Sequence, residues 1–254
     1  MVNSASRQLD RLGQTGRIDP DDYQIRESKR AKHVSIKVSH LGEVEVVVPP
    51  QFDRRELAKI LAQRQRWIEK HLHRIAAERR SLSPKPEDPL PAQILLRSLS
   101  EEWTIDYQLT QRVAPSISVP QPGRLVLRTL DISPDICYPL LRHWLSQQAR
   151  IHFDPWLQDI SQTIQLSYSA MSVRGQKTRW ASCSSRKSIS LNYKLLFLPP
   201  ALVRYVFIHE LCHTVHLNHS TKFWALVGEK EPHYKSLDRD LRTAWRYVPE
   251  WVDR

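Results

Sequence analysis

The sequence contains few cysteines, and none of them is arranged as a pair. Its 254 residues include three, Cys137, Cys183 and Cys212, without any C-x-x-C spacing. An odd number of cysteines in a chain that lacks an export signal is typical of reduced cytoplasmic thiols rather than of a disulfide scaffold. We expect Cys183 and Cys212 to be buried thiols and not additional metal ligands.

Long apolar runs are missing as well. No stretch approaches the roughly 18 consecutive apolar residues of a membrane-spanning helix. The first twenty residues lack the apolar core of a secretory signal, and residues 1–25 are expected to form a loose polar arm. No internal repeat, heptad series or low-complexity tract is found. With 41% hydrophobic and 26% charged residues, the chain is predicted to be a cytoplasmic globular protein without membrane contact.

Acidic residues are too few to balance the basic ones. The chain has 38 Lys and Arg against 27 Asp and Glu, a net charge of +11, and residues 26–80 alone have 14 against 7. Such a basic segment favours contact with nucleic acid, nucleotides or acidic proteins. Solvated surface charge gives the same composition, so nucleic acid binding stays open at this point.

The first structured segment is predicted to be a β-hairpin followed by a long helix. Valines and an isoleucine alternate with polar residues over 34–38 and 44–48, on either side of a turn at 40–43. Asp53 and Glu56 have capping-box spacing, and apolar residues then recur at helical intervals, which predicts an amphipathic helix over 53–80. The outer face of this helix is basic and carries Arg55, Lys59, Arg66, Lys70 and Arg74. These side chains either bind the phosphates of a nucleic acid or are simply solvated.

Proline spacing and helical periodicity indicate how the chain divides. Four prolines between residues 84 and 91 predict a linker at 82–91. Strands at 103–109 and 124–128 are expected to extend the N-terminal antiparallel sheet, giving a basic β-rich subdomain over 26–135. Helical spacing over 140–164, with a kink or restart at Asp154-Pro155, then opens a mostly helical subdomain over 136–254. The predicted fold class is therefore α+β.

The segment from Leu202 to Val215 contains the residues best suited to chemistry. It is rich in apolar residues, follows Pro199-Pro200 and includes the H-E-x-x-H motif from His209 to His213. On a helix the two histidines lie one turn apart on one face, where both imidazoles can bind one Zn²⁺, while Glu210 can act as general base on a metal-bound water. The motif favours zinc, although the sequence does not distinguish it from Mn²⁺, Co²⁺ or Ni²⁺.

A catalytic zinc site needs a third protein ligand. His216 lies a helical rise of about 10.5 Å beyond His209, which is too far for a shared metal ion. His219 follows an asparagine, a residue that tolerates the left-handed conformation at a helix end, so the chain can turn there and bring His219 back. A downstream carboxylate, Glu229 or Glu231, remains an alternative third ligand.

Several short motifs occur in a fixed order along the chain. They are Val46-Val47-Val48-Pro49, Trp67-Ile68, Arg179-Trp180-Ala181-Ser182-Cys183, Asn192-Tyr193-Lys194-Leu195, the H-E-x-x-H segment, and Asn218-His219-Ser220-Thr221-Lys222-Phe223-Trp224. Together they resemble the YgjP-like metallopeptidase domain family, related in motif to the SprT-like and Wss1-like proteases, from about Arg26 to Arg242. Ala181 stands where that family usually has glycine. The Cβ atom of alanine argues against another group approaching the backbone closely at this position, but the metal site is not affected.

The resemblance implies a zincin-like C-terminal subdomain that hydrolyses peptide bonds. In it, His209, His213 and His219 hold Zn²⁺, and Glu210 takes the proton of the zinc-bound water and returns it to the leaving amine. The expected partner is a peptide or protein substrate.

Residues ahead of the H-E-x-x-H segment are candidates for substrate binding. A second basic cluster surrounds Trp180 within 14 residues and consists of Arg174, Lys177, Arg179, Arg186 and Lys187. Lining a cleft, these side chains would select an acidic or phosphorylated substrate or stabilise an oxyanion; otherwise they are solvated charges around a core tryptophan. The segment Ile189–Leu198 is a candidate for backbone pairing with an extended peptide. The candidate substrate-binding residues are Arg179, Trp180 and Asn192.

Functions of other classes remain open on the sequence alone. An activated water can also attack phosphorus, so a nucleotide phosphohydrolase of the pyrophosphatase type is one alternative. The basic N-terminal segment suggests another, a DNA-associated protease or binding module. A structural protein with a vestigial zinc site is the third.

Overall fold

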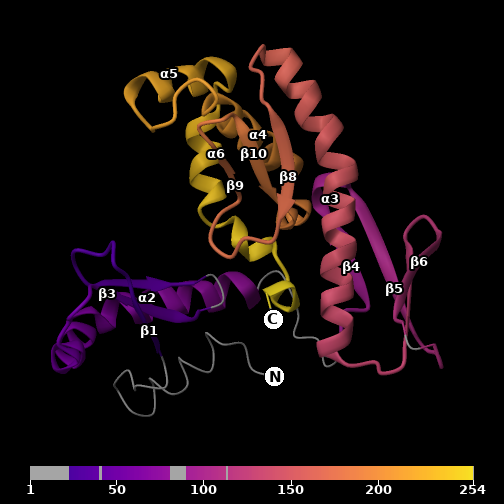
Figure 1. Ribbon diagram of the computed structural model, residues 1–254, viewed down its shortest axis with the longest axis horizontal. Helices are drawn as coiled ribbons and strands as arrows, with labels where there is room; N and C mark the ends of the chain where they lie inside the picture. The colour runs from indigo at the N-terminus through magenta and orange to yellow at the C-terminus, as the bar shows by residue number, and fades with distance from the viewer. Residues whose placement is uncertain (1–22, 40–41, 81–89, 113, 254) are drawn as a thin grey trace. The chain divides into compact units, whose positions relative to one another are not determined.

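The structure, a computed structural model, describes residues 23–39, 42–80, 90–112 and 114–253 (Figure 1). It divides into two compact units, Met1–Glu87 and Asp88–Arg254. The predicted linker lies outside the described residues except for its last two positions, and so do residues 40–41 of the predicted turn and residues 1–22 of the predicted arm. Residues 23–25, which the arm prediction included, instead belong to a strand.

The first unit contains a three-stranded sheet. Its strands are β1 (Tyr23–Glu27), β2 (Ser35–Val38) and β3 (Val44–Val48), in the order β1-β3-β2. The predicted hairpin is confirmed, because β2 and β3 pair in antiparallel register. The prediction of a purely antiparallel sheet is wrong, since β1 pairs with β3 in parallel. Without β1, the second edge of the largely buried β3 would leave its backbone groups unpaired.

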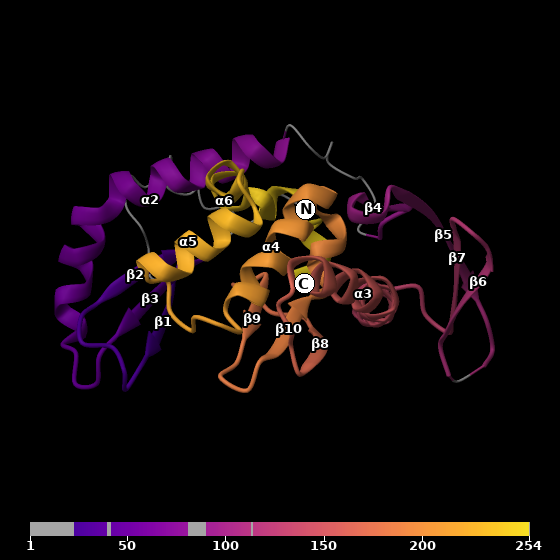
Figure 2. The ribbon, with the colours of Figure 1, turned by 90° about the horizontal axis from the view of Figure 1, so that it is seen from above.

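A long helix covers this sheet, as the apolar spacing predicts. A short 3-10 turn, η2 (Arg54–Glu56), leads into α2 (Leu57–Arg80). Asp53 caps the turn by accepting a hydrogen bond from the backbone N–H of Arg55, 2.9 Å away. The apolar stripe of α2 packs on the valines of β3, and Val46, Ile68 and Leu72 are fully buried. Both views show α2 lying along the sheet (Figures 1 and 2).

The second unit begins with a four-stranded sheet of its own. Its strands are β4 (Gln93–Leu96), β5 (Glu101–Leu109), β6 (Ser116–Gln121) and β7 (Arg124–Thr129), with the short turn η3 (Arg97–Leu99) after β4. The two predicted strands exist as β5 and β7, but the expectation that they extend the N-terminal sheet is wrong. They pair in the order β4-β5-β7-β6, and their apolar side chains belong to the core of the second unit.

The helix α3 (Pro134–Ile164) lies between the two sheets of the second unit, in contact with β6 on one side and β8 on the other (Figure 2). It starts earlier than predicted, with a proline at its first position, where no N–H is needed. The helix does not restart at Pro155. That residue and Ile151, whose carbonyl loses its helical partner, are both exposed, so water can satisfy the carbonyl.

The remaining elements surround a second three-stranded sheet. Its strands are β8 (Ala170–Arg174), β9 (Ala181–Cys183) and β10 (Ser188–Asn192), with β10 in the middle. The helical elements that follow are η4 (Tyr193–Phe197), α4 (Pro200–Cys212), α5 (Thr221–Lys230), α6 (Tyr234–Leu241), η5 (Ala244–Tyr247) and η6 (Glu250–Asp253). The α+β fold class is confirmed. No helix in the described part of the chain has both the length and the apolar character needed to cross a bilayer.

The first unit has a small core, so its stability should be sensitive to a single cavity. We expect Leu72→Ala to lower the free energy of opening of β3 and α2 by about 2–5 kcal/mol, because Leu72 is fully buried. Hydrogen exchange of the β3 and α2 amides measures this. Lys70→Ala, on the exposed face of the same helix, should change it by less than about 0.5 kcal/mol. Equal effects of the two substitutions would contradict the packing described.

Candidate metal centre

The helix α4 carries the H-E-x-x-H motif through the interior of the second unit. Pro200 occupies its first position, and most of its residues are buried, including Val203, Tyr205 and Phe207. A helix that is apolar on nearly all sides belongs in a core. His209 and Glu210 therefore sit in a rigid, largely desolvated last turn, and the helix ends with His213 as its C-cap.

The chain turns after His213 and brings a third imidazole to the first two. The Nε2 atoms of His209 and His219 lie 3.1 Å apart. One nitrogen each from His209, His213 and His219 lie within 4.8 Å of one another, the only such convergence of three or more His, Cys, Asp or Glu ligand atoms among the described residues. The ligands of one zinc ion lie roughly 3 to 4 Å apart, so this donor set fits a tetrahedral ion with a fourth position left open.

A backbone contact orients the second imidazole. His213 Nδ1 donates to the carbonyl oxygen of His216, 2.9 Å away, which leaves Nε2 as the nitrogen with a free lone pair. Histidine ligands are commonly oriented by such a second hydrogen bond. The His216 side chain is not part of the cluster, as expected. Its carbonyl role could not have been predicted, since every residue has a carbonyl.

An aromatic ring supports all three imidazoles. Phe223 is fully buried and stacks on His213, with ring centroids 4.3 Å apart. Its ring also lies 5.0 Å from that of His209 and 4.9 Å from that of His219. Ser220 caps α5 and so fixes the helix turn that presents Phe223. Sequence reasoning assigned Phe223 no role, although it forms part of the motif after His219.

Burial lowers the pKa of two of the three imidazoles. Desolvation lowers the pKa of His209 to about 4, helped by the neighbouring charges of His213 and His219. Desolvation also lowers the pKa of His213, although its hydrogen bond to His216 works in the opposite direction. Neutral imidazoles have the free lone pairs that metal binding requires.

Glu210 lies beside the cluster with an unsatisfied carboxyl group. The residue is 7% exposed, and Oε2 has no hydrogen-bond partner among the described residues. Burial raises the pKa of Glu210 to about 8, against the opposing effect of the positive charge on Arg179. A buried oxygen without a partner is costly, and it suits a group that binds a water molecule or a substrate.

The two carboxylates considered as alternative third ligands form ion pairs with basic side chains instead. Glu229 pairs with Lys230 at 2.9 Å, and Glu231 pairs with Arg204 and accepts a hydrogen bond from the backbone N–H of His233. Neither carboxylate belongs to the cluster that the described residues form.

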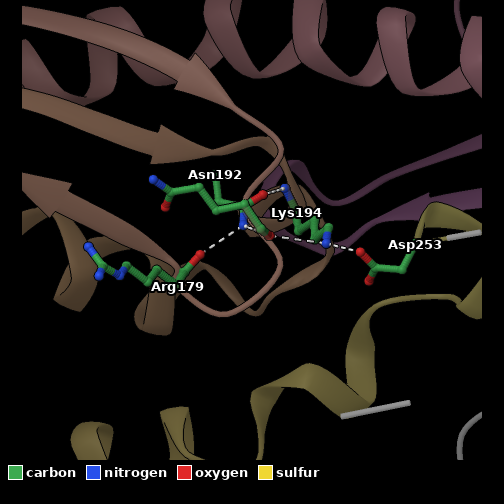
Figure 3. A network of polar contacts seen from close by, with 5 residues as sticks. Arg179, Asn192, Lys194 and Asp253 are labelled. Carbon is green, nitrogen blue, oxygen red and sulfur yellow. Dashed lines mark hydrogen bonds and ion pairs between the residues drawn. The ribbon is translucent and has the colours of Figure 1, made fainter. Parts of the chain in front are cut away.

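The predicted substrate-binding residues have different surroundings. Arg179 is exposed, and its charge acts on Glu210. Trp180 is buried and stacks on Trp245 with ring centroids 3.8 Å apart. Asn192 is fully buried, and its amide bonds to backbone atoms only (Figure 3). Trp180 and Asn192 therefore make their contacts within the protein, and Arg179 is the candidate of the three whose side chain is exposed.

Other expectations near the site can also be compared with the structure. The segment predicted to pair with a peptide forms β10 and η4, and both edges of β10 are already paired, so it cannot accept another strand. The second basic cluster is exposed and makes no ion pair within the described residues. Cys212 is buried as expected, whereas Cys183 is only partly buried, and burial raises the pKa of both thiols.

Comparisons with known proteins give a family match and a solved structure to which the chain is similar. The family model described as "YgjP-like, metallopeptidase domain" matches residues 32–244. The crystal structure of the metallopeptidase zymogen of Pyrococcus abyssi abylysin is similar at a TM-score of 0.32 with 24% sequence identity, covering 35% of this chain and 91% of that chain. No curated protein matches the chain at a significant level.

Metal content distinguishes the possible ligand sets. Elemental analysis of the purified protein should find about one ion per chain, lost in His219→Ala. His216→Ala should keep the ion because only its backbone carbonyl contacts His213, and Glu229→Ala should keep it because that carboxylate pairs with Lys230. Loss of metal in Glu229→Ala with retention in His219→Ala would exclude His219 as the third ligand.

Proposed function

This chain belongs to the YgjP-like metallopeptidase domain family, and on that basis we propose that it is a zinc-dependent peptidase. In this proposal His209, His213 and His219 hold the ion and Glu210 is the catalytic acid and base. The observation that carries it is the convergence of three imidazoles beside a buried carboxyl group that has no partner among the described residues. The substrate is a peptide or protein.

Three converging imidazoles favour zinc among the divalent ions, because nitrogen ligands in a tetrahedral arrangement suit it. When bound, zinc supplies a Lewis acid that acidifies a water molecule and polarises the peptide carbonyl. The protein contributes the fixed geometry. α4 and the turn after it hold the imidazoles, and Phe223 restricts their rings from one side.

Glu210 moves the proton. As a carboxylate, its unpartnered Oε2 accepts a proton from the attacking water and then donates it to the leaving amine nitrogen. Its elevated pKa supports this exchange, because a group that must both take and give a proton near neutral pH works best with a pKa close to that pH.

Arg179 is the substrate-binding candidate that the geometry supports. Its side chain is exposed and makes no ion pair within the described residues, yet its charge reaches Glu210. A guanidinium at this place can donate hydrogen bonds to the carbonyl oxygen of the scissile peptide as negative charge develops on it. We therefore assign Arg179 to oxyanion stabilisation.

The nucleotide phosphohydrolase and the DNA-associated module gain no support from the family match, which names a metallopeptidase. The exposed basic cluster is compatible with either, but exposed charges without partners are ordinary on protein surfaces.

Removing the carboxyl group that serves as acid and base should strongly slow turnover without removing the metal. We expect Glu210→Gln to lower kcat/KM on unstructured peptides by about 10²–10⁴-fold, because the amide cannot accept the proton of the attacking water. Metal content should be unchanged, and Glu102→Gln, at an exposed position on β5, should behave as the wild type. Full peptidase activity in Glu210→Gln would overturn the proposal. So would metal-dependent phosphate release from nucleotides by a wild type that does not cleave peptides.

Removing the guanidinium should affect the chemical step more than binding. We expect Arg179→Ala to lower kcat by about 10²–10³-fold with a smaller change in KM, the size found when one oxyanion donor is lost. Arg112→Ala, an exposed arginine after β5, is the matched control and should leave both constants unchanged. A change confined to KM would indicate that Arg179 binds the substrate ground state instead.

A further inference from the structure

The loop between β8 and β9, residues 175–180, is held from beneath by one buried asparagine. Asn192 Nδ2 donates to the carbonyl oxygens of Gln176 and Arg179, each 2.8 Å away. The backbone N–H of Asn192 donates to the Trp180 carbonyl at 2.9 Å. Because Asn192 is fully buried at the end of the central strand, these three bonds fix both halves of the loop to the sheet.

A buried ion pair provides a second attachment. Lys194 Nζ donates to the Gln176 carbonyl at 3.2 Å and pairs with Asp253 of η6. The two side chains are only 1% and 6% exposed. The ammonium group also lies 5.4 Å from the ring centre of Trp245, the residue on which Trp180 stacks. Lys194 thus contacts the first half of the loop directly and the second half through two stacked tryptophans.

The start of the loop is also closely packed, so its backbone has little room to move. A Cβ atom at Gly175 would lie 2.7 Å from the Tyr193 ring, so the ring rests directly on the backbone where the loop begins. A buried ion pair adds little net stability compared with an apolar pair of the same size. It does, however, hold its two side chains in one orientation. Its effect here is on geometry, because Lys194 aims a donor at one carbonyl of the loop.

The loop contains an arginine whose charge acts on the candidate site. In Figure 3 the Arg179 carbonyl points into the network, while its guanidinium points away from it. Trp180 and then β9 follow directly, and β9 packs against α4, which carries Glu210. The backbone of Arg179 is therefore fixed by buried groups, while the charge of its exposed side chain acts on Glu210 of α4.

We propose that Asn192, Lys194 and Asp253 are positioning residues that act through Arg179. The buried pair between Lys194 and Asp253 sets the loop at 175–180 and so determines where the guanidinium meets the substrate. This inference rests on the proposed peptidase function and adds residues that touch neither metal nor substrate. Positioning errors of about 1 Å can cost on the order of 10²-fold in rate.

The test replaces both members of the ion pair, so that neither Lys194 nor Asp253 is left as a buried charge without the other. Lys194→Met/Asp253→Leu keeps the volume apolar, and Arg124→Met/Asp106→Leu, which removes an exposed pair in the same unit, is its control. We expect the first double variant to lose about 10- to 100-fold in kcat, with metal content and melting temperature close to those of the wild type. Asp253→Asn, which keeps the acceptor, is the fallback if the double variant does not fold, and Asp253→Glu should restore part of the activity.

A double-mutant cycle shows whether the effect passes through Arg179. In an Arg179→Ala background, replacing the ion pair should cause little further loss of kcat. Equal fold losses in the two backgrounds would overturn the proposal, because the pair would then act independently of Arg179. Unchanged kcat in the wild-type background would overturn it as well.

A readout that does not need activity separates this inference from the proposed function. Hydrogen exchange at residues 175–180 should become faster in the Lys194→Met/Asp253→Leu variant while α4 stays protected. Unchanged exchange in the loop would overturn the positioning role. A wild type that cleaves no peptide, combined with faster loop exchange in the variant, would refute the peptidase proposal and leave the loop attachment supported.

Discussion

The candidate site depends on one constraint: α4 has to stop within one turn of His209. Helical spacing places His209 and His213 on the same face, but a continuing helix would carry every later residue away from them. The helix ends at His213, whose ring donates to the His216 carbonyl, and the chain returns to deliver His219. One hydrogen bond thus spans the turn that follows the helix and orients an imidazole, so the turn and the donor set are built together.

The features that the sequence predicts well are those set by neighbouring residues. Helical periodicity located α2, and the apolar-rich segment after Pro199-Pro200 located α4. Valine alternation located the pairing of β2 with β3, and the H-E-x-x-H spacing identified two side chains on one helix face. The choice of His219 over Glu229 also followed from local reasoning, since it needed only a chain reversal after an asparagine. The structure places His219 with the other two imidazoles and Glu229 beside Lys230.

The features that it does not predict depend on contacts far apart in the chain. Period-two alternation identifies a strand but not its partner, so β5 and β7 were assigned to the wrong sheet and β1 was taken for part of a loose arm. Burial of Asn192 likewise has no local signature. Its polar side chain suggested substrate binding until its backbone partners in the loop at 175–180 were known.

The distance in sequence between Lys194 and Asp253 has a consequence for the order of folding. The two residues are 59 positions apart, so their contact closes a long loop. Because closing a long loop has a large entropic cost, this contact is expected to form late, after local elements such as α4. The three imidazoles all lie within an eleven-residue stretch, 209–219, and can come together earlier. The contact that holds Arg179 in place would then form after the three imidazoles have come together. On the proposed function, full hydrolytic activity would arrive only with the last tertiary contacts, so a partly folded chain would be a poor peptidase toward itself and its neighbours.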